Sequence, residues 1–96
     1  MLVNMRELLG VAERGHFAVP AFNISDYAMF NGIIDISEQK SAPVIIEIHP
    51  NELKHIGTDV VAGMVRRAES STVPVVIHLD HGASFANVMV AIRAGF

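Results

Sequence analysis

The stretch that decides the fold is PVVIHLDHG, at positions 74–82. Its apolar run predicts a buried strand over Val75 to Leu79. Because side chains alternate along a strand, His78 and Asp80 are expected on one face. His81 follows just past the strand, where the next residue, a glycine, allows the chain to turn. An imidazole beside a carboxylate can bind a metal ion or move a proton, so this strand end is a candidate chemical site.

Two further apolar runs precede this stretch. VIIEI, Val44 to Ile48, is expected to be a buried strand, and HFAVPAF, His16 to Phe22, a shorter one in which Pro20 lacks a backbone donor. Asn23 follows the first of these strands and His49 follows the second. Each expected strand therefore ends in polar residues.

Apolar residues at helical spacing fill the segments around the strands. Each of the four expected helices has a serine, threonine or asparagine cap, and three of them are followed by a stop signal. The four expected helices are Asn4 to Gly15, Ser25 to about Lys40, Asp59 to about Ser70 with Thr58 as its cap, and Ser84 to Gly95. We expect His49 to Gly57 to be a loop.

Buried strands that alternate with amphipathic helices indicate a parallel sheet covered by helices. A doubly wound sheet and a (β/α)8 barrel both fit this order. No glycine-rich phosphate turn follows a strand, and the polar residues lie at the carboxyl ends, where barrel enzymes place their sites. We therefore expect an α/β fold that is the N-terminal part of a (β/α)8 TIM barrel, with about three β/α units after an extra N-terminal helix. On this interpretation residues 1–96 are part of one domain of ~250 residues, whose remainder is absent from the chain.

Composition narrows the function classes. The chain has 96 residues, 51% of them hydrophobic, a formal net charge of -3 and no cysteine. The absence of a basic cluster argues against nucleic-acid binding, and no apolar run is long enough for a membrane span. No signal peptide is expected, and the lack of cysteine fits the cytoplasm.

The polar strand ends have a plain structural alternative. Such residues often cap helices or anchor loops, and buried polar groups usually find partners. Asn23 is about as well explained as a turn or cap residue. A catalytic zinc ion takes three protein ligands, so one or two histidines do not make a zinc site by themselves.

Three segments together resemble a known family. AVPAFNI (Ala18 to Ile24), APVIIEI (Ala42 to Ile48) and PVVIHLDHG (Pro74 to Gly82) are similar, in this order and spacing, to the start of the class II aldolases. These are zinc-dependent ketose-bisphosphate aldolases, which include fructose- and tagatose-bisphosphate aldolase. The similarity covers essentially the whole chain, and the H-x-D-H element combined with F-N is fairly specific.

The resemblance implies an aldolase reaction of carbohydrate metabolism, of the kind that occurs in glycolysis. His81 matches a histidine that binds the catalytic Zn²⁺, and Asp80 matches the aspartate that exchanges a proton with the C4 oxygen or the aldehyde carbonyl. Asn23 matches a substrate-site asparagine, and His78 is expected to support the cluster by a hydrogen bond. The implied substrate is a ketose (bis)phosphate, split into or made from dihydroxyacetone phosphate and an aldehyde. The remaining zinc ligands and phosphate loops of the family have no counterpart in these residues.

One departure concerns the substrate. The family often has a small hydroxyl residue or glycine, near the substrate phosphate, where this chain has His49. His49 is therefore a candidate substrate-binding residue that either contacts a phosphate as a cation or marks a different aldehyde or acid. Glu47, on the same strand face, is a candidate either to orient His49 or simply to be a paired buried carboxylate.

Two other readings remain open. The chain is either a non-catalytic structural piece that self-associates through an exposed sheet edge, or part of another metal-dependent TIM-barrel enzyme with a non-bisphosphate substrate, such as a hydrolase. As partners we expect a sugar phosphate and further copies in a homo-oligomer, with no nucleic acid and no membrane.

Overall fold

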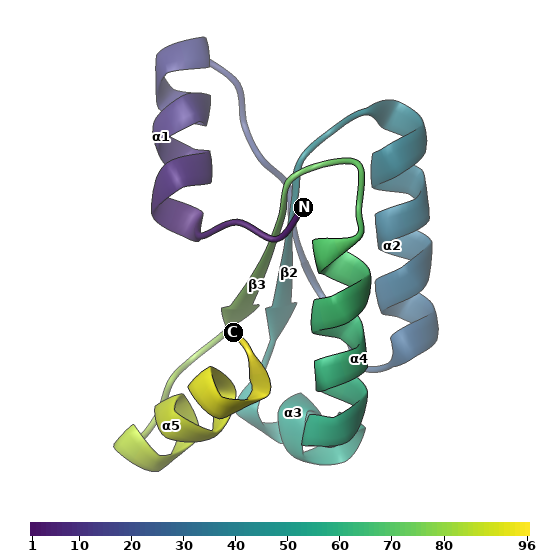
Figure 1. Cartoon of the computed structure of the whole chain (residues 1–96). Coiled ribbons are helices and arrows are strands. Elements are labelled where there is room, and N and C mark those ends of the chain that lie inside the picture. Colours follow the sequence, from purple (N-terminus) through teal and green to yellow (C-terminus); the bar gives the residue numbers. More distant parts are fainter.

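The computed structural model describes residues 1–96, in which helices alternate with three parallel strands (Figure 1). The elements are α1 (Met5–Gly15), β1 (Ala21–Asn23), α2 (Tyr27–Lys40), β2 (Val44–Ile48), α3 (Pro50–Ile56), α4 (Thr58–Glu69), β3 (Val75–Leu79) and α5 (Phe85–Ala94). The strand order is β1-β2-β3, so each strand lies beside its neighbour in the sequence. The expected α/β architecture with a helix ahead of the first strand is confirmed. None of the helices is long and apolar enough to cross a membrane.

The main core lies between the sheet and the helices α2 and α4. Alternate residues of β2 and β3 point to these helices, because side chains of a strand alternate between its faces. Phe30, Ile34, Ile46, Val61, Met64 and Val75 are among the side chains fully buried there. Their burial fixes the register of the sheet, since a slip by one residue would turn the apolar side chains to the other face.

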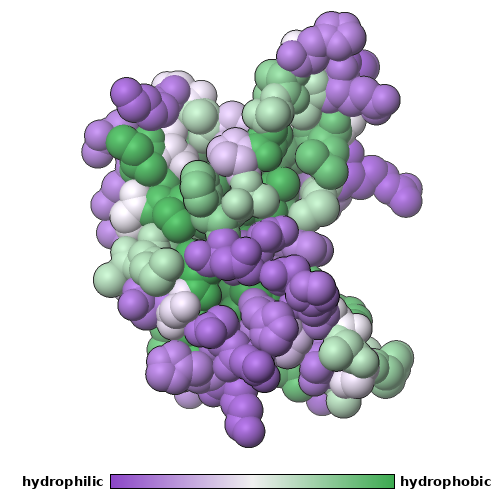
Figure 2. Space-filling view, turned by 180° about the vertical axis from the view of Figure 1, so that it is seen from behind, coloured by the Kyte–Doolittle hydropathy of each residue, from purple (hydrophilic) through white to green (hydrophobic).

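The opposite face of the sheet is covered at one end only. Helix α1 lies across this face, on the other side from α2 and α4 (Figure 1). Its Leu8 packs against Ile45 and Val76 in a second small core. Residues further along the strands on this face, toward their carboxyl ends, are left open. The carboxyl ends of the strands are drawn at the bottom in Figure 1, and in the view from behind hydrophilic side chains gather toward the bottom of the molecule (Figure 2).

The segment before α1 covers the start of the β3 edge. Val75 N–H donates to the carbonyl oxygen of Met1, and Val3 N–H donates to that of Val75, both at 2.9 Å. Leu2 and Val75 form a short parallel bridge. The edge of β3 is therefore already paired at its amino end.

The first strand is shorter than expected. A strand over His16 to Phe22 was predicted, but β1 covers only Ala21–Asn23. His16 adopts a left-handed conformation with φ 53° and ends α1, and Phe17 N–H donates to the carbonyl oxygen of Ala12 in that helix. Because these groups close the helix, they cannot join the sheet.

The expected loop from His49 to Gly57 is wrong, because most of it is helix α3. His49 Nδ1 accepts a hydrogen bond from Asn51 N–H, and Pro50 occupies the first turn, where its missing N–H is not needed. Leu53 is the buried residue of this helix. Two apolar residues in contact with the core, Leu53 and Ile56, are too weak a periodic signal to reveal a seven-residue helix.

Two expected helix caps are also wrong. Asp26, not Ser25, caps α2 by accepting a hydrogen bond from Met29 N–H at 2.7 Å. Thr58 lies inside α4, whose cap residue is Gly57 and has no side-chain hydrogen bond. Asn4 and Ser84 cap α1 and α5 as expected.

Candidate functional site

A row of three polar residues crosses the open face of the sheet. Asn23 of β1 is paired with Glu47 of β2, and Glu47 is paired with His78 of β3. Because residues paired in register point to the same face of a parallel sheet, the three side chains lie beside one another. The row below it, Ala21, Ile45 and Val76, is apolar. Along the strands, this face of the sheet thus changes from apolar to polar within two residues.

Asp80 continues this polar surface past the end of β3. Its backbone N–H donates to the carbonyl oxygen of Ile48 at 3.0 Å, which extends the sheet ladder by one bond. Its carboxylate Oδ2 accepts a hydrogen bond of 2.8 Å from Asn23 Nδ2. Asp80 is therefore fixed at both its backbone and its side chain, and 28% of the side chain remains exposed.

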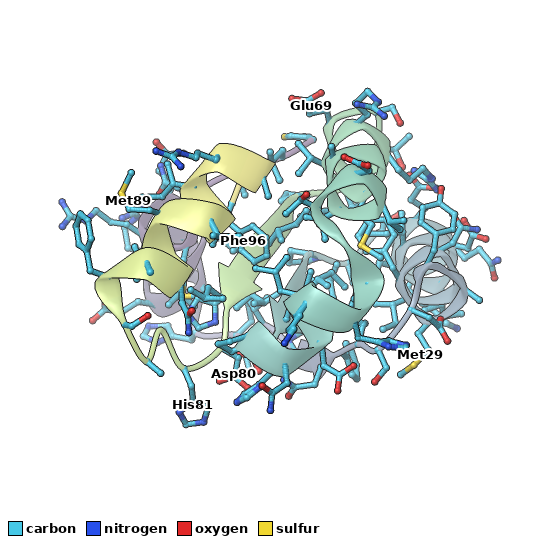
Figure 3. All side chains as sticks on the ribbon, turned by 90° about the horizontal axis from the view of Figure 1, so that it is seen from below. Met29, Glu69, Asp80, His81, Met89 and Phe96 are labelled. Carbon is cyan, nitrogen blue, oxygen red and sulfur yellow. The ribbon has the colours of Figure 1, made fainter.

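His81 follows in a left-handed turn, with φ 59°. Its Nε2 lies 3.7 Å from Asp80 Oδ1, close enough for a charge interaction but too long for a direct hydrogen bond. The ring is 76% exposed. In the view onto the carboxyl ends of the strands, His81 projects outward beyond Asp80 (Figure 3). The turn therefore presents an accessible imidazole beside a held carboxylate.

His49 reaches the same place from β2. Because its Nδ1 accepts the hydrogen bond that caps α3, the proton of the neutral ring is on Nε2. Its ring meets that of His81 edge-on, with centroids 5.8 Å apart. All four candidate residues, Asn23, His49, Asp80 and His81, thus form one continuous cluster at the ends of three strands.

Glu47 has a different partner from the one the sequence suggested. Its Oε1 lies 3.3 Å from His78 Nδ1, so it pairs across the strands and does not orient His49. His78 does make a supporting hydrogen bond, as expected, but to Glu47. The contact depends on the register of β2 and β3, which places Glu47 directly beside His78. The sequence alone does not give this register.

The fit of a metal ion can be judged from the donors present. No group of three or more histidine, aspartate or glutamate side chains is placed to hold a metal ion. His81 has the ligand chemistry that zinc prefers and is accessible. The residues fit a zinc site as the source of one ligand, and a complete site needs others from outside this chain.

A hollow of about 500 Å³ lies next to the cluster, between α3 and α5. Asn51, Lys54, Thr58 and Asn87 supply its polar lining. None of Asn23, Asp80 or His81 borders it. The candidate site is therefore an open surface at the strand ends, and this hollow is separate from it.

Comparisons with known proteins point to one family. Residues 3–96 match the family described as "Fructose-bisphosphate aldolase class-II". Fructose-bisphosphate aldolase from Mycoplasma pneumoniae is 39% identical over 100 residues, a match that covers all of this chain and 34% of the relative. The enzyme of the same name from Geobacillus stearothermophilus is 38% identical, with 99% of this chain and 34% of the relative covered.

Solved structures give the same result. The crystal structure of the YdjI aldolase from Escherichia coli K12 matches all of this chain with a TM-score of 0.93 and 33% identity, and the match covers 37% of that chain. The present chain therefore spans about a third of the length of the proteins it matches, and its three parallel strands and helices match the N-terminal part of the aldolase TIM barrel. The chain belongs to the class-II fructose-bisphosphate aldolase family.

Proposed function

We propose that these residues are the N-terminal part of a single TIM-barrel domain in a cytoplasmic, zinc-dependent aldolase. The reaction is cleavage or formation of the C3–C4 bond of a ketose (bis)phosphate, with dihydroxyacetone phosphate as one product or substrate. The family match and the names of the relatives support this reaction class. The observation that carries it is the contact of Asn23 with Asp80, at 2.8 Å, beside the exposed ring of His81.

The proposed division of labour follows from the contacts. His81 would hold Zn²⁺ together with ligands from outside this chain, and the bound ion supplies a Lewis acid that polarises the substrate's oxygens. Asp80 accepts the proton of the C4 hydroxyl as the C3–C4 bond breaks and returns it to the aldehyde oxygen in the reverse direction. The electron pair of the broken bond stays at C3, and this half must take up one proton there to become dihydroxyacetone phosphate.

Asn23 holds Asp80 in the orientation that this proton transfer needs. Its amide binds Oδ2, which leaves Oδ1 on the side of His81. Asn23 also has a second N–H, which is available to a substrate oxygen. We propose that Asn23 both orients Asp80 and lines the substrate site.

His49 is proposed to contact the anionic end of the substrate. The cap bond at Nδ1 leaves its Nε2–H as a hydrogen-bond donor, and a phosphate or carboxylate oxygen accepts such a bond. His49 thereby becomes the residue in this chain on which the choice between a bisphosphate and another acidic substrate depends.

The test is aldehyde release by the native gene product that carries these residues. Fructose and tagatose bisphosphates are the first substrates, assayed before and after removal of divalent metal by a chelator. Asp80→Asn is expected to lower turnover by roughly 10²–10⁴-fold, the usual range for loss of a general acid–base group. Asp59→Asn, in the first turn of α4, is the matched control and keeps wild-type turnover. An Asp80→Asn protein with wild-type turnover would contradict the proposal.

A further inference from the structure

Glu47 lies between two possible partners on the open face of the sheet. In the register of the strands, Asn23 is its neighbour on one side and His78 its neighbour on the other. Adjacent strands are separated by about 4.8 Å, so a glutamate side chain can reach either neighbour. The structure shows it bound to His78 only, at 3.3 Å.

The choice matters because Asn23 already has a partner. Its Nδ2 donates to Asp80, which stands on β3's side of the sheet, two residues beyond His78. The Asn23–Asp80 hydrogen bond therefore passes over β2, the strand that carries Glu47. A carboxylate at position 47 competes for the two N–H groups of this amide, one of which binds Asp80 while the other is proposed to bind a substrate oxygen, and it carries the same charge as Asp80.

His78 removes this competition. A carboxylate only accepts hydrogen bonds, so the 3.3 Å contact requires a proton on His78 Nδ1. The pair is partly sheltered, with 40% of the His78 side chain and 23% of the Glu47 side chain exposed, and this limits the ability of water to replace the contact.

We propose that the Glu47–His78 pair is a positioning device: His78 binds the carboxylate of Glu47 and thereby keeps the amide of Asn23 for Asp80. Neither residue touches the reacting atoms in this scheme. Both act through the Asn23–Asp80 hydrogen bond. The effect of this pair on catalysis rests on the proposed role of Asp80 in proton transfer. The Glu47–His78 contact does not depend on that role.

The tautomer of His78 tests the pairing without any substitution. Long-range ¹H–¹⁵N correlation NMR of the labelled protein distinguishes the two ring nitrogens. A proton on Nδ1, in a neutral or a charged ring, supports the proposal. A neutral ring with its only proton on Nε2 overturns it, because Nδ1 would then have nothing to donate to Glu47.

Four variants test the competition, with the side-chain amide signal of Asn23 as the readout. His78→Ala frees Glu47 and is expected to shift this signal. His78→Asn, which keeps a donor near the place of Nδ1, leaves it close to the wild-type position. Glu47→Met removes the competing acceptor and also leaves it unchanged. The double variant His78→Ala with Glu47→Met returns it to that position.

Two results would contradict the competition. One is an Asn23 signal that does not respond to His78→Ala. The other is a shift that persists in the double variant, because a purely steric role of the His78 ring is not repaired by removing Glu47. If His78→Ala does not fold, the tautomer of His78 still tests the pairing, and a shifted Asn23 signal in His78→Asn or Glu47→Met would contradict the competition.

Kinetics connect the pair to catalysis. In the native gene product, His78→Ala is expected to lower kcat by roughly ten- to a hundred-fold, the usual scale for a supporting residue, with a smaller change in KM. The double variant recovers most of the loss. If the protein has no aldolase activity at all, the proposed function fails, but the NMR results still show whether His78 keeps Glu47 away from Asn23. If activity is present and the double variant recovers nothing, the positioning device alone is refuted.

Discussion

His81 combines an exposed imidazole with an unfavourable backbone conformation. Its φ of 59° lies in the left-handed region, which costs a residue with a Cβ atom roughly 1–2 kcal/mol. Backbone strain of this kind is common at sites where the direction of a side chain matters more than stability. Here the turn carries the ring away from the strand and past Asp80.

Substitution at position 81 should separate stability from function. His81→Gly relieves the strain but adds unfolded-state entropy, so its free energy of unfolding is expected within about 1 kcal/mol of wild type. His81→Val, with a branched Cβ atom at positive φ, is expected to lose about 1–2 kcal/mol. Urea unfolding followed by circular dichroism measures both. Equal free energies of unfolding for the valine and glycine variants would show that the backbone at position 81 is not strained.

Two neighbouring residues at the start of α2, Asp26 and Ser25, allow a matched test of helix capping. Asp26 accepts the capping hydrogen bond from Met29 N–H, whereas Ser25, which the sequence favoured, makes no such bond. Asp26→Ala is expected to lower the free energy of unfolding by about 1 kcal/mol. Ser25→Ala is expected to change it by less than about 0.5 kcal/mol. A larger loss for Ser25→Ala in urea unfolding would show that the cap is misplaced.

An ion pair joins α2 to α4 on the side of the sheet away from the site. Arg67 Nη2 donates to Glu38 at 2.9 Å, and the same atom contacts Asp35 at 3.1 Å. The hydrogen bonds from Arg67, and next those from Ser71 and Thr72, lower the pKa of Glu38 from its ordinary 4.5 to about 2. Because the folded-state pKa is below the unfolded one, this stabilisation is present above pH 4.5 and is lost as the pH falls toward 2.

Glu38→Gln should therefore lower the free energy of unfolding at neutral pH. The loss relative to wild type should become smaller as the solution is made acidic. Urea midpoints of wild type and variant are expected to differ most above pH 4.5 and to converge toward pH 2. Glu13→Gln, on the exposed surface of α1 and without an ion pair in the structure, is the control substitution. A difference between Glu38→Gln and wild type that is constant with pH would show that the pair has no such role.

The accuracy of the sequence interpretation varied between elements for physical reasons. The strands Val44–Ile48 and Val75–Leu79 are continuous apolar runs, and their predicted bounds agree with β2 and β3. The bounds of β1 failed because the conformation of His16 depends on how α1 ends. Helix α3 was missed because its cap is a histidine nitrogen, and histidine is not among the residues usually read as caps.

At the scale of the whole molecule, the grouping of the site residues could be predicted but their pairing could not. Parallel strands bring their carboxyl ends to one edge, so Asn23, His49, Asp80 and His81 were expected together. Which side chain binds which depends on the register of the strands and on the direction that each side chain takes. The partners of Glu47 and Asp80 therefore became visible only in the structure.

Large apolar side chains on α5 remain uncovered in this chain. Phe85 is 81% exposed and Ile92 is 57% exposed. Exposed apolar groups favour association, so the isolated 96-residue chain is expected to sediment as more than a monomer. Replacing both residues by serine should reduce the association, whereas Glu13→Ser on α1 should not. Monomeric sedimentation of the wild-type chain at all concentrations would contradict this expectation.

The proposed role of His81 as a zinc ligand can be tested without an activity assay. The most direct test is the zinc content of the native gene product, measured by mass spectrometry of the purified protein. About one Zn²⁺ per chain is expected in wild type and in a His55→Ala control, whose substitution lies in the last turn of α3. Loss of the ion in His81→Ala is the predicted result, and full retention of zinc in that variant would contradict the account.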